Sequence, residues 1–531
     1  MIHSNLIRFL VVSTLSFVLH VQHAQAQQPR IFYSDIVSGP SSGGASGGGA
    51  FITIMGSGFG DAQGASTATL AGSPIQRIVQ WSAHKIVVQI DSSSRSGPIE
   101  FEVVGKGRSN AIPFEVAAGH VYFVSTVGRD RKSGAFLSPW ASIAHAAQVM
   151  RPGDITYVMD GVKLAGLDNY HAALSIQSAG TTHSPIALVA YPEARAVIGD
   201  STGQEFGVRT PAIHSGPFSG WVLAGFTIRG ANTALKLDGV NDWRVVNNDF
   251  SCPFGDGASG CVEVTGSSSI AFLGNTVHDT GKPRGSKRYQ SVYFTTDSNH
   301  IDAGWNHIMN NRSCRGIQFH SSPVDASSGF NQYDLLIHDN QIEGQVCDGL
   351  NLATIDPSRG RIMVFNNLIR HVGTGPAPPD GESNYACISS PGIVNHGPAG
   401  SGTVEIFNNT LSDCGKHRGP SAGAFSVGIH SPELMLKNNL IDQAEGEAYF
   451  TSGTAMDHVN GSNNLWFGGG PAPQQTDHNL TKNPDLSQDE NGFALSASSP
   501  AKHAGYDCGV AYDLRGASRA VIGKCSVGAF E

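Results

Sequence analysis

Met363-Val364-Phe365-Asn366-Asn367 is an apolar run that ends in asparagine, and its recurrence decides how most of the chain can fold. Similar runs occupy 244–248, 270–275, 302–306, 335–340, 405–409 and 435–439. The first asparagine recurs every 26 to 42 residues, as expected for one solenoid coil with loops of variable length. Asparagine tolerates left-handed backbone at a sharp bend, and its amide can hydrogen-bond the equivalent residue of the next coil. The repeat therefore predicts a solenoid whose asparagine ladders are structural.

A second short strand precedes the asparagine strand in several coils. These runs occupy 234–237, 261–264, 291–294, 316–319 and 349–352. Side chains alternate across a strand, so the apolar members point into the solenoid and the others point outward. Parallel coils about 4.8 Å apart then align the outward residues in one column. That column consists of Lys236, Glu263, Tyr293, Gln318 and Asn351. Its donors, acceptors and single aromatic ring suit a sugar-binding surface.

More polar groups are expected beside this column. The next outward position of each strand holds Asp238, Thr265, Thr295, His320 and Ala353. Arg315 and Asp348 come just before two of the strands. The insertion from His278 to Tyr289 is expected to reach the same edge and carries a cluster of basic residues, which are Lys282, Arg284, Lys287 and Arg288.

Each of these residues also has a purely structural interpretation. Lys236 and Glu263 can form a salt bridge between neighbouring coils. Tyr293 can be a stacking residue, and His320 can bond to a backbone carbonyl at the end of its strand. The basic insertion can simply be solvated. The sequence leaves both interpretations open.

The composition favours an all-β protein and limits its partners. Glycine accounts for 65 of 531 residues and charged residues for 15%, which is typical of many short strands joined by tight turns. The net charge of −9 gives no general basic field, so we expect no nucleic-acid partner. A polyanionic substrate stays possible because a few local cations are enough to bind it.

The first 26 residues have the pattern of a secretory signal peptide. Arg8 precedes an apolar run over 9–21, and Ala24-Gln25-Ala26 forms a small-x-small cleavage site. We expect a secreted protein, extracellular or periplasmic, with no membrane contact after cleavage, and a monomer.

Eight cysteines follow the signal segment, as expected of a chain bound for an oxidising compartment. Cys252 with Cys261 would close a short loop, and Cys508 with Cys525 would join the C-terminal end. The remaining four could form disulfides or lie as buried thiols between coils. They are Cys314, Cys347, Cys387 and Cys414.

Residues 29–116 form a separate unit with alternating strands. The stretch 56–60 (Gly-Ser-Gly-Phe-Gly), then Trp81-Ser82 and Ser109-Asn110, resembles the TIG/IPT family of immunoglobulin-like domains. This resemblance implies a β-sandwich that acts as a spacer or binding module.

Residues 120–531 resemble the secreted right-handed parallel β-helix proteins of the pectate lyase-like superfamily. The opening over 121–155 is similar to their N-terminal cap, in which a short helix, here over 142–150, covers the end of the solenoid. The segment 483–531 resembles their closing segment and is expected to cap the other end. The fold class is therefore all-β, a sandwich followed by a right-handed parallel β-helix.

This resemblance implies an enzyme acting on polysaccharides, most often a lyase or a glycoside hydrolase. In a uronate lyase, Arg315, Gln318 and Asn351 could neutralise the carboxylate, Lys236 or His320 could be the base, and Tyr293 the acid. Further substrate contacts are expected from Asp348, Lys287, Arg284 and His278.

Two other functions compete with a lyase. A hydrolase needs two carboxyl groups facing each other, for which Glu263 with Asp238 or Asp348 is available. The Asn-Thr-Asp, Asp-Asp and Gly-His-Gly set of polygalacturonase-like hydrolases has no match here. A protein that only binds glycans is the third alternative.

The sequence identifies no certain cofactor, and Ca²⁺ is possible. Asp249, Asp256 and Glu263 lie close in sequence and offer oxygen ligands. The loops lack the dense spacing of acidic residues found in a dedicated calcium site.

Overall fold

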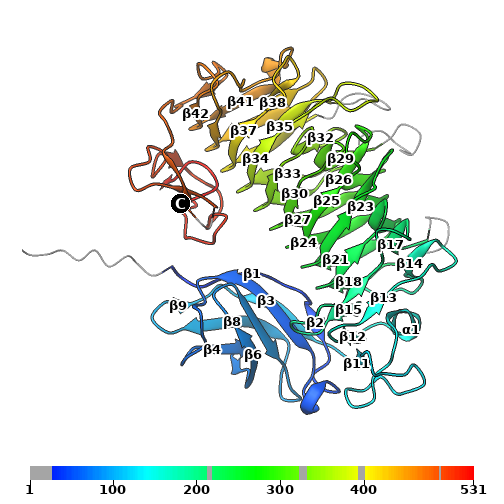
Figure 1. Cartoon of the computed structure of the whole chain (residues 1–531). Helices are drawn as coiled ribbons and strands as arrows, with labels where there is room; N and C mark the ends of the chain where they lie inside the picture. Colours follow the sequence, from blue (N-terminus) through cyan, green and yellow to red (C-terminus); the bar gives the residue numbers. More distant parts are fainter. Residues whose placement is uncertain (1–26, 212–217, 322–331, 393–400, 490–491) are drawn as a thin grey trace, which may run out of the picture.

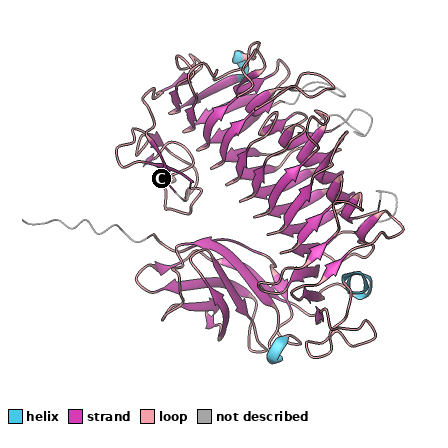
Figure 2. Cartoon of the chain, in the orientation of Figure 1, coloured by secondary structure: helices cyan, strands magenta, loops and turns pink. Residues whose placement is uncertain are grey.

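The structure is a computed structural model that describes residues 27–211, 218–321, 332–392, 401–489 and 492–531. The predicted signal peptide lies outside these residues. The described chain forms a β-sandwich and a long parallel β-helix, and strands dominate both parts (Figures 1 and 2). Within the described residues, no helix is long and apolar enough to cross a membrane.

The N-terminal part packs two sheets face to face. The first sheet has the order β1 (Arg30–Ser34), β3 (Phe51–Ser57), β7 (Lys85–Gln89) and β6 (Arg77–Trp81). The second has β2 (Ser38–Gly39), β10 (Ile112–Val116), β8 (Gly97–Val103), β4 (Thr67–Leu70) and β5 (Ser73–Pro74), with β9 (Gly107–Arg108) beside β8. Phe59, just after β3, and Phe101 of β8 are fully buried and meet edge to face.

Three parallel sheets run the length of the solenoid. The first consists of β11 (Val121–Val124), β12 (Ile155–Val158), β15 (Ile186–Ala190), β18 (Trp221–Ala224), β21 (Asn241–Val246), β24 (Ser268–Leu273), β27 (Asn299–Gly304), β30 (Leu335–His338), β33 (Ile362–Phe365), β36 (Thr403–Phe407), β39 (Glu433–Lys437), β41 (Val459–Ser462) and β43 (Thr476–Asp477). We call it the thirteen-stranded sheet.

The second, or eleven-stranded, sheet consists of β13 (Lys163–Leu164), β16 (Val197–Ile198), β19 (Thr227–Arg229), β22 (Asp249–Cys252), β25 (Thr276–Thr280), β28 (His307–Met309), β31 (Gln341–Glu343), β34 (Leu368–Val372), β37 (Thr410–Cys414), β40 (Leu440–Asp442) and β42 (Leu465–Phe467). The third, or nine-stranded, sheet consists of β14 (Ala172–Ser175), β17 (Phe206–Arg209), β20 (Thr233–Asp238), β23 (Ser259–Thr265), β26 (Tyr289–Thr295), β29 (Arg315–His320), β32 (Leu350–Leu352), β35 (Tyr385–Ser390) and β38 (Ala422–Val427).

Helix α1 (Ile143–Val149) lies at the start of the solenoid (Figure 1). Ser142 caps it by accepting a hydrogen bond from the backbone N–H of His145. Ile143 and Ala146 are buried in the main core of the solenoid, so the helix covers its first coils with an apolar face.

The asparagine pairs divide two roles that we expected a single residue to combine. The second residue of each turn is the asparagine that makes the ladder, in which each side-chain N–H donates to the carbonyl oxygen of the next asparagine at 2.9–3.2 Å. The ladder consists of Asn248, Asn275, Asn306, Asn340, Asn367, Asn409, Asn439 and Asn464. The first residue takes the left-handed conformation, for example φ 54° at Asn366 and φ 53° at Asn438.

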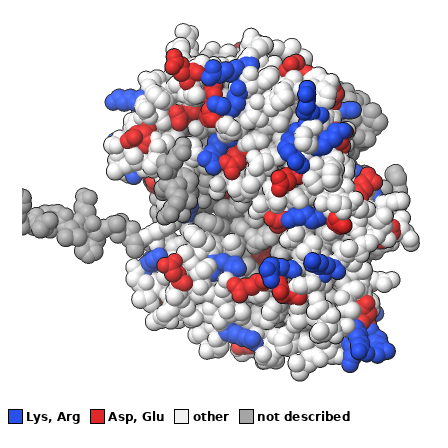
Figure 3. Space-filling model, viewed as in Figure 1, with Lys and Arg blue, Asp and Glu red and all other residues white. Residues whose placement is uncertain are grey.

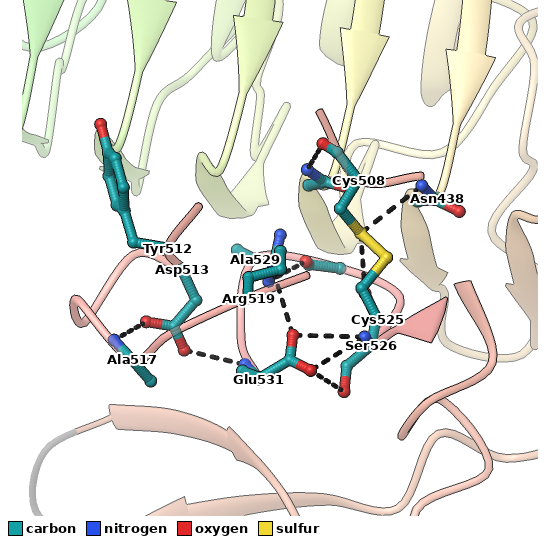
Figure 4. Close-up of polar contacts among 12 residues, drawn as sticks. Asn438, Cys508, Tyr512, Asp513, Ala517, Arg519, Cys525, Ser526, Ala529 and Glu531 are labelled. Atoms are coloured by element: carbon teal, nitrogen blue, oxygen red, sulfur yellow. Dashed lines mark hydrogen bonds and ion pairs between the residues drawn. A yellow bond between two sulfur atoms is a disulfide. The ribbon is translucent and has the colours of Figure 1, made fainter. Parts of the chain in front are cut away.

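The left-handed asparagines hold other parts of the chain against the solenoid. Asn366 donates to the backbone oxygen of Tyr512 at 3.0 Å, Asn408 to that of Cys508 at 2.7 Å, and Asn438 to that of Tyr506 at 3.0 Å. Figure 4 shows this region with the disulfide between Cys508 and Cys525. The closing segment therefore runs along the side of the last coils, whereas we expected it to cap their end.

This closing segment also meets the sandwich. The guanidinium of Arg30 lies 3.6 Å from the ring centroid of Tyr512, and Gln27 donates to the backbone oxygen of Arg515 at 3.0 Å. The C-terminal region accordingly lies between the last coils and the sandwich in Figure 1. β44 (Leu486–Asp489) pairs with β45 (Gly492–Leu495), and β46 (Gly505–Tyr506) with β47 (Lys524–Cys525).

The sandwich is fixed to the outer face of the thirteen-stranded sheet. The Tyr157 hydroxyl donates to the backbone oxygen of Phe51 at 2.7 Å, and Arg244 donates to that of Ser34 at 2.7 Å. Tyr33 donates to Asn247 at 2.7 Å, and apolar residues of both parts share one core. The sandwich therefore packs on the thirteen-stranded sheet and not on the outer face of the nine-stranded sheet.

All eight cysteines form disulfides. The two expected pairs, Cys252 with Cys261 and Cys508 with Cys525, are present. Cys314 also pairs with Cys347, and Cys387 with Cys414, so the alternative of buried free thiols is wrong. These last two bonds are possible because stacking brings residues of neighbouring coils within disulfide reach.

His338 links the ladder turn to the outer face of the same sheet. Its ring stacks on Phe365 and meets Trp305 edge on, while its nitrogens lie 2.8 Å from an oxygen of Asp302 and 2.7 Å from one of Asp339. Burial lowers the pKa of His338, but the two carboxylates outweigh burial and raise it to about 9.

We predict that Asn340→Ala lowers the free energy of unfolding by roughly 2 to 4 kcal/mol. The substitution leaves the backbone N–H of Asn306 and the backbone oxygen of Ala303 without their side-chain partners inside the core. Urea unfolding measures the change, with the exposed Asn169→Ala as control. Equal stability of the two variants would show that the ladder does not hold the coils.

We also predict that stability falls at alkaline pH because of His338. The folded pKa lies above the ordinary value of 6.5, so the contribution is full below about pH 6.5 and is lost as the pH rises through about 9. Unfolding free energies measured between about pH 6 and pH 10 test this. His338→Phe should flatten the slope, and an unchanged slope in that variant would contradict the assignment.

Candidate functional site

The outward residues of the nine-stranded sheet form one row in register. Pairing joins Arg209 to Lys236, Lys236 to Glu263, Glu263 to Tyr293, Tyr293 to Gln318, and Gln318 to Asn351. Ser389 and Ser426 continue the row beyond Asn351. The sequence analysis did not identify Arg209, because apolar and polar residues alternate only weakly in the short strand Phe206–Arg209. The position of this arginine at the end of the strand was the signal that could have revealed it.

Lys236 and Glu263 form an ion pair on neighbouring strands. The Lys236 ammonium lies 2.9 Å from Oε1 of Glu263, and Oε2 accepts a hydrogen bond from Ser259 at 2.9 Å. The lysine side chain is 23% exposed and the glutamate 10%. This contact occupies the ammonium of Lys236 with the carboxylate of the neighbouring strand.

Tyr293 and His320 form the second pair, one strand further along. The Tyr293 hydroxyl lies 3.1 Å from Nδ1 of His320, and the two rings are nearly parallel, with an angle of 14°. Burial, and then the positive charge of Arg315, lower the pKa of His320 to about 4. The imidazole is therefore neutral at physiological pH and can accept a proton.

Asn351 and Asp348 are correctly placed near the row but are too buried to contact a sugar. The Asp348 side chain is 0% exposed and Asn351 is 1% exposed. Asn351 donates to Asp348 at 2.9 Å and to Ser389 at 3.0 Å, and it accepts from Gln318 at 3.2 Å. Because stacked polar side chains satisfy one another here, these two residues support the row from beneath.

Arg315 is held in place by its neighbours. Nε lies 3.1 Å from Asp348, Nη1 donates to the backbone oxygen of Lys287 at 2.7 Å, and Nη2 donates to Ser383 at 2.7 Å. Burial raises the pKa of Asp348, while the arginine acts in the opposite direction. These three contacts fix the position of the guanidinium beside the row.

The basic insertion is tied down by acidic residues. Lys282 lies 2.5 Å from Asp256, and the backbone N–H of Lys287 donates to Asp380 at 2.8 Å. Lys287 also donates through its ammonium to the backbone oxygen of Glu382 at 3.1 Å. Arg284 is exposed at the tip of the insertion.

His278 does not belong to this surface. It lies in β25 of the eleven-stranded sheet, where its nitrogens are 2.8 Å from Asp279 and 3.3 Å from Asp249. The strand continues to Thr280, so the insertion begins after His278 and cannot carry it to the row. The expectation that His278 contacts substrate beside the row is wrong.

The three carboxylates considered for Ca²⁺ are each paired with a different cation. Asp249 lies 2.5 Å from Arg229, Asp256 pairs with Lys282, and Glu263 with Lys236. Among the described residues, no group of three or more potential metal ligands comes together. The residues present therefore do not fit a calcium ion.

Charges of both signs are interspersed on the molecular face drawn in Figure 3. This distribution agrees with the modest net charge of −9. Any attraction for an anionic ligand therefore has to come from a local arrangement of side chains.

Residues 34–116 match the family model of the IPT/TIG domain. The sandwich is an IPT/TIG domain. No curated relative matches the sequence. For the rest of the described chain, the parallel pairing of its strands shows that the fold is a β-helix.

Several solved structures are similar to the chain at low identity. The complex of XylC with xylose is 10% identical, covers 77% of this chain and 98% of its own, and has a TM-score of 0.46. Pectate lyase Pel9A is 14% identical, with 78% and 96% covered and a TM-score of 0.45. The family 28 exopolygalacturonase of Yersinia enterocolitica is 9% identical, with 86% and 99% covered and a TM-score of 0.43. Similarity at this level assigns no residue a role, so function has to be argued from the side chains of this chain.

Proposed function

We propose that this protein is a secreted polysaccharide lyase that cleaves a uronate-containing glycan by β-elimination. The observation that carries the proposal is the contact of 3.1 Å between Tyr293 and a neutral His320 on the outer face of the nine-stranded sheet. β-Elimination needs a base for the C5 proton and an acid for the leaving oxygen, and this pair can supply both.

One tautomer of His320 prepares both groups for the reaction. When Nδ1 carries the proton and donates a hydrogen bond to the Tyr293 oxygen, the lone pair of Nε2 is free to accept the C5 proton. The tyrosine hydroxyl then keeps its own proton for the glycosidic oxygen. As the C4–O bond breaks, the C4–C5 double bond forms. The pair then holds an imidazolium beside a phenolate, and transfer of the Nδ1 proton to the phenolate neutralises both.

The substrate carboxylate at the cleaved bond requires a hydrogen-bond donor nearby. We assign this role to the amide of Gln318, which lies on the strand next to Tyr293. One of its N–H groups donates to Asn351, and the other can serve the carboxylate. The fixed charge of Arg315 adds to the favourable potential at this point.

The carboxyl groups favour a lyase over a hydrolase. Hydrolysis needs two carboxyl groups that reach opposite sides of the scissile bond. Asp348 has no exposed side chain, and Glu263, the remaining member of either pair, is bonded to Lys236 and Ser259. Neither Asp348 nor Glu263 is therefore placed as a free general acid, and both proposed pairs need one of them.

Secretion is supported by the four disulfides, because such bonds persist in oxidising compartments. We propose that the IPT/TIG domain contributes stability rather than substrate contacts. Its packing on the thirteen-stranded sheet keeps it away from the row.

We predict that Tyr293→Phe and His320→Asn each abolish turnover without unfolding the protein. Incubation with polygalacturonate, alginate and glycosaminoglycans, followed by absorbance near 235 nm, measures formation of the unsaturated product. The exposed Tyr506→Phe and His183→Asn serve as matched controls and should retain activity. New reducing ends without absorbance would mean a hydrolase, and glycan binding without any product would mean a binding protein.

We predict that kcat/KM of the wild type stays level from neutral pH down to about pH 5 and falls as the pH approaches about 4. The base acts only in its neutral form, so protonation of His320 sets this acidic limb. Initial rates in buffers of constant ionic strength measure the profile. A midpoint near 6.5 would show that His320 is not the buried base described here.

A further inference from the structure

Arg209 begins the charged part of the row and lacks an acidic partner. Nη1 donates to the backbone oxygen of Tyr170 at 3.2 Å, and the guanidinium lies 4.5 Å from the ring centroid of Phe206 on the same strand. Its Nε is buried without a hydrogen-bond partner. In the part of the chain that the structure describes, no carboxylate pairs with Arg209.

The carboxylate next along the row does not neutralise Arg209. Arg209 and Lys236 are register neighbours on β17 and β20, and Glu263 on β23 is the acidic residue that follows them. The carboxylate of Glu263 is already engaged by Lys236 and Ser259. Arg209 is left without a carboxylate partner among the described residues, and its Nη N–H groups can bind the carboxylate of a ligand in two-point fashion.

We propose that Arg209, supported by Lys236, binds the carboxylate of an acidic sugar residue several units away from the bond that is cleaved. Arg209 lies three strand spacings from Tyr293, which is roughly 14 Å at about 4.8 Å per strand. This inference rests on the proposed function only for the position of the cleaved bond. In this role, Arg209 selects glycans that carry several acidic sugars over glycans that carry a single uronate.

Phe206 prepares the guanidinium for this role. A cation over an aromatic face is held in a preferred plane, so less conformational freedom is lost when the ligand binds. The bond to the Tyr170 backbone fixes a second point. A carboxylate can accept hydrogen bonds from the Nη groups and offset the charge of Arg209, which a neutral sugar cannot do, so charge decides which glycan binds.

Binding measurements in the Tyr293→Phe background test the proposal without turnover. Titration calorimetry would use galacturonate and guluronate oligomers as disaccharide and hexasaccharide, together with the methyl-esterified hexagalacturonate. Arg209→Gln should weaken binding of an acidic hexasaccharide on the order of tenfold and leave the disaccharide unaffected. Arg195→Gln, whose side chain is 88% exposed and paired with Asp160, is the matched control and should change neither.

The outcomes separate this inference from the proposed function. Equal affinities of the parent and Arg209→Gln for the acidic hexasaccharides overturn the inference. It is also overturned if the parent binds neither the galacturonate nor the guluronate oligomers. Equal binding of the methyl ester and the free acid by the parent also overturns it. Failure of the wild type to form product absorbing at 235 nm overturns the lyase proposal alone, because the length and charge dependence of binding does not need catalysis.

Discussion

Hydrogen bonds between stacked asparagine amides hold neighbouring coils of the solenoid in one register. Each amide in the ladder is buried and donates to a backbone carbonyl of the preceding coil, and each one before Asn464 also donates to the next asparagine, as Asn340 does toward Ala303 and Asn367. A buried polar group without a partner is costly, so a slipped coil would lose several bonds together. Register matters for the candidate site, since a shift of one residue would turn Glu263 and Tyr293 into the core.

The residue before each ladder asparagine extends this constraint to the rest of the molecule. Its left-handed backbone turns its side chain away from the ladder and toward the outside of the coil. Asn247 thereby meets Tyr33 of the IPT/TIG domain, and Asn438 meets the closing segment at Tyr506. One kind of turn thus builds the solenoid and attaches both ends of the described chain to it.

The candidate site places a charged pair and a neutral pair on neighbouring strands. Lys236 and Glu263 neutralise one another through an ion pair. Burial keeps His320 uncharged beside Tyr293, and the fixed charge of Arg315 acts in the same direction. A neutral imidazole next to a phenol can move protons, whereas the ion pair and Arg209 provide electrostatic contacts. Asp348 and Asn351 bond to Arg315 and Gln318 from within the sheet without reaching the surface.

The sequence by itself determined the solenoid, the IPT/TIG domain and the row from Lys236 to Gln318, because strand alternation and a repeated turn are local properties of the chain. Local patterns could not reveal that Asp348 and Asn351 are buried, since burial depends on what the neighbouring coils place above a side chain. They also could not show that His278 lies on another sheet, or that Cys314 pairs with Cys347. Only the tertiary structure decided the contact between Tyr293 and His320 and the position of Arg209, because stacking brings together side chains that lie far apart in the chain.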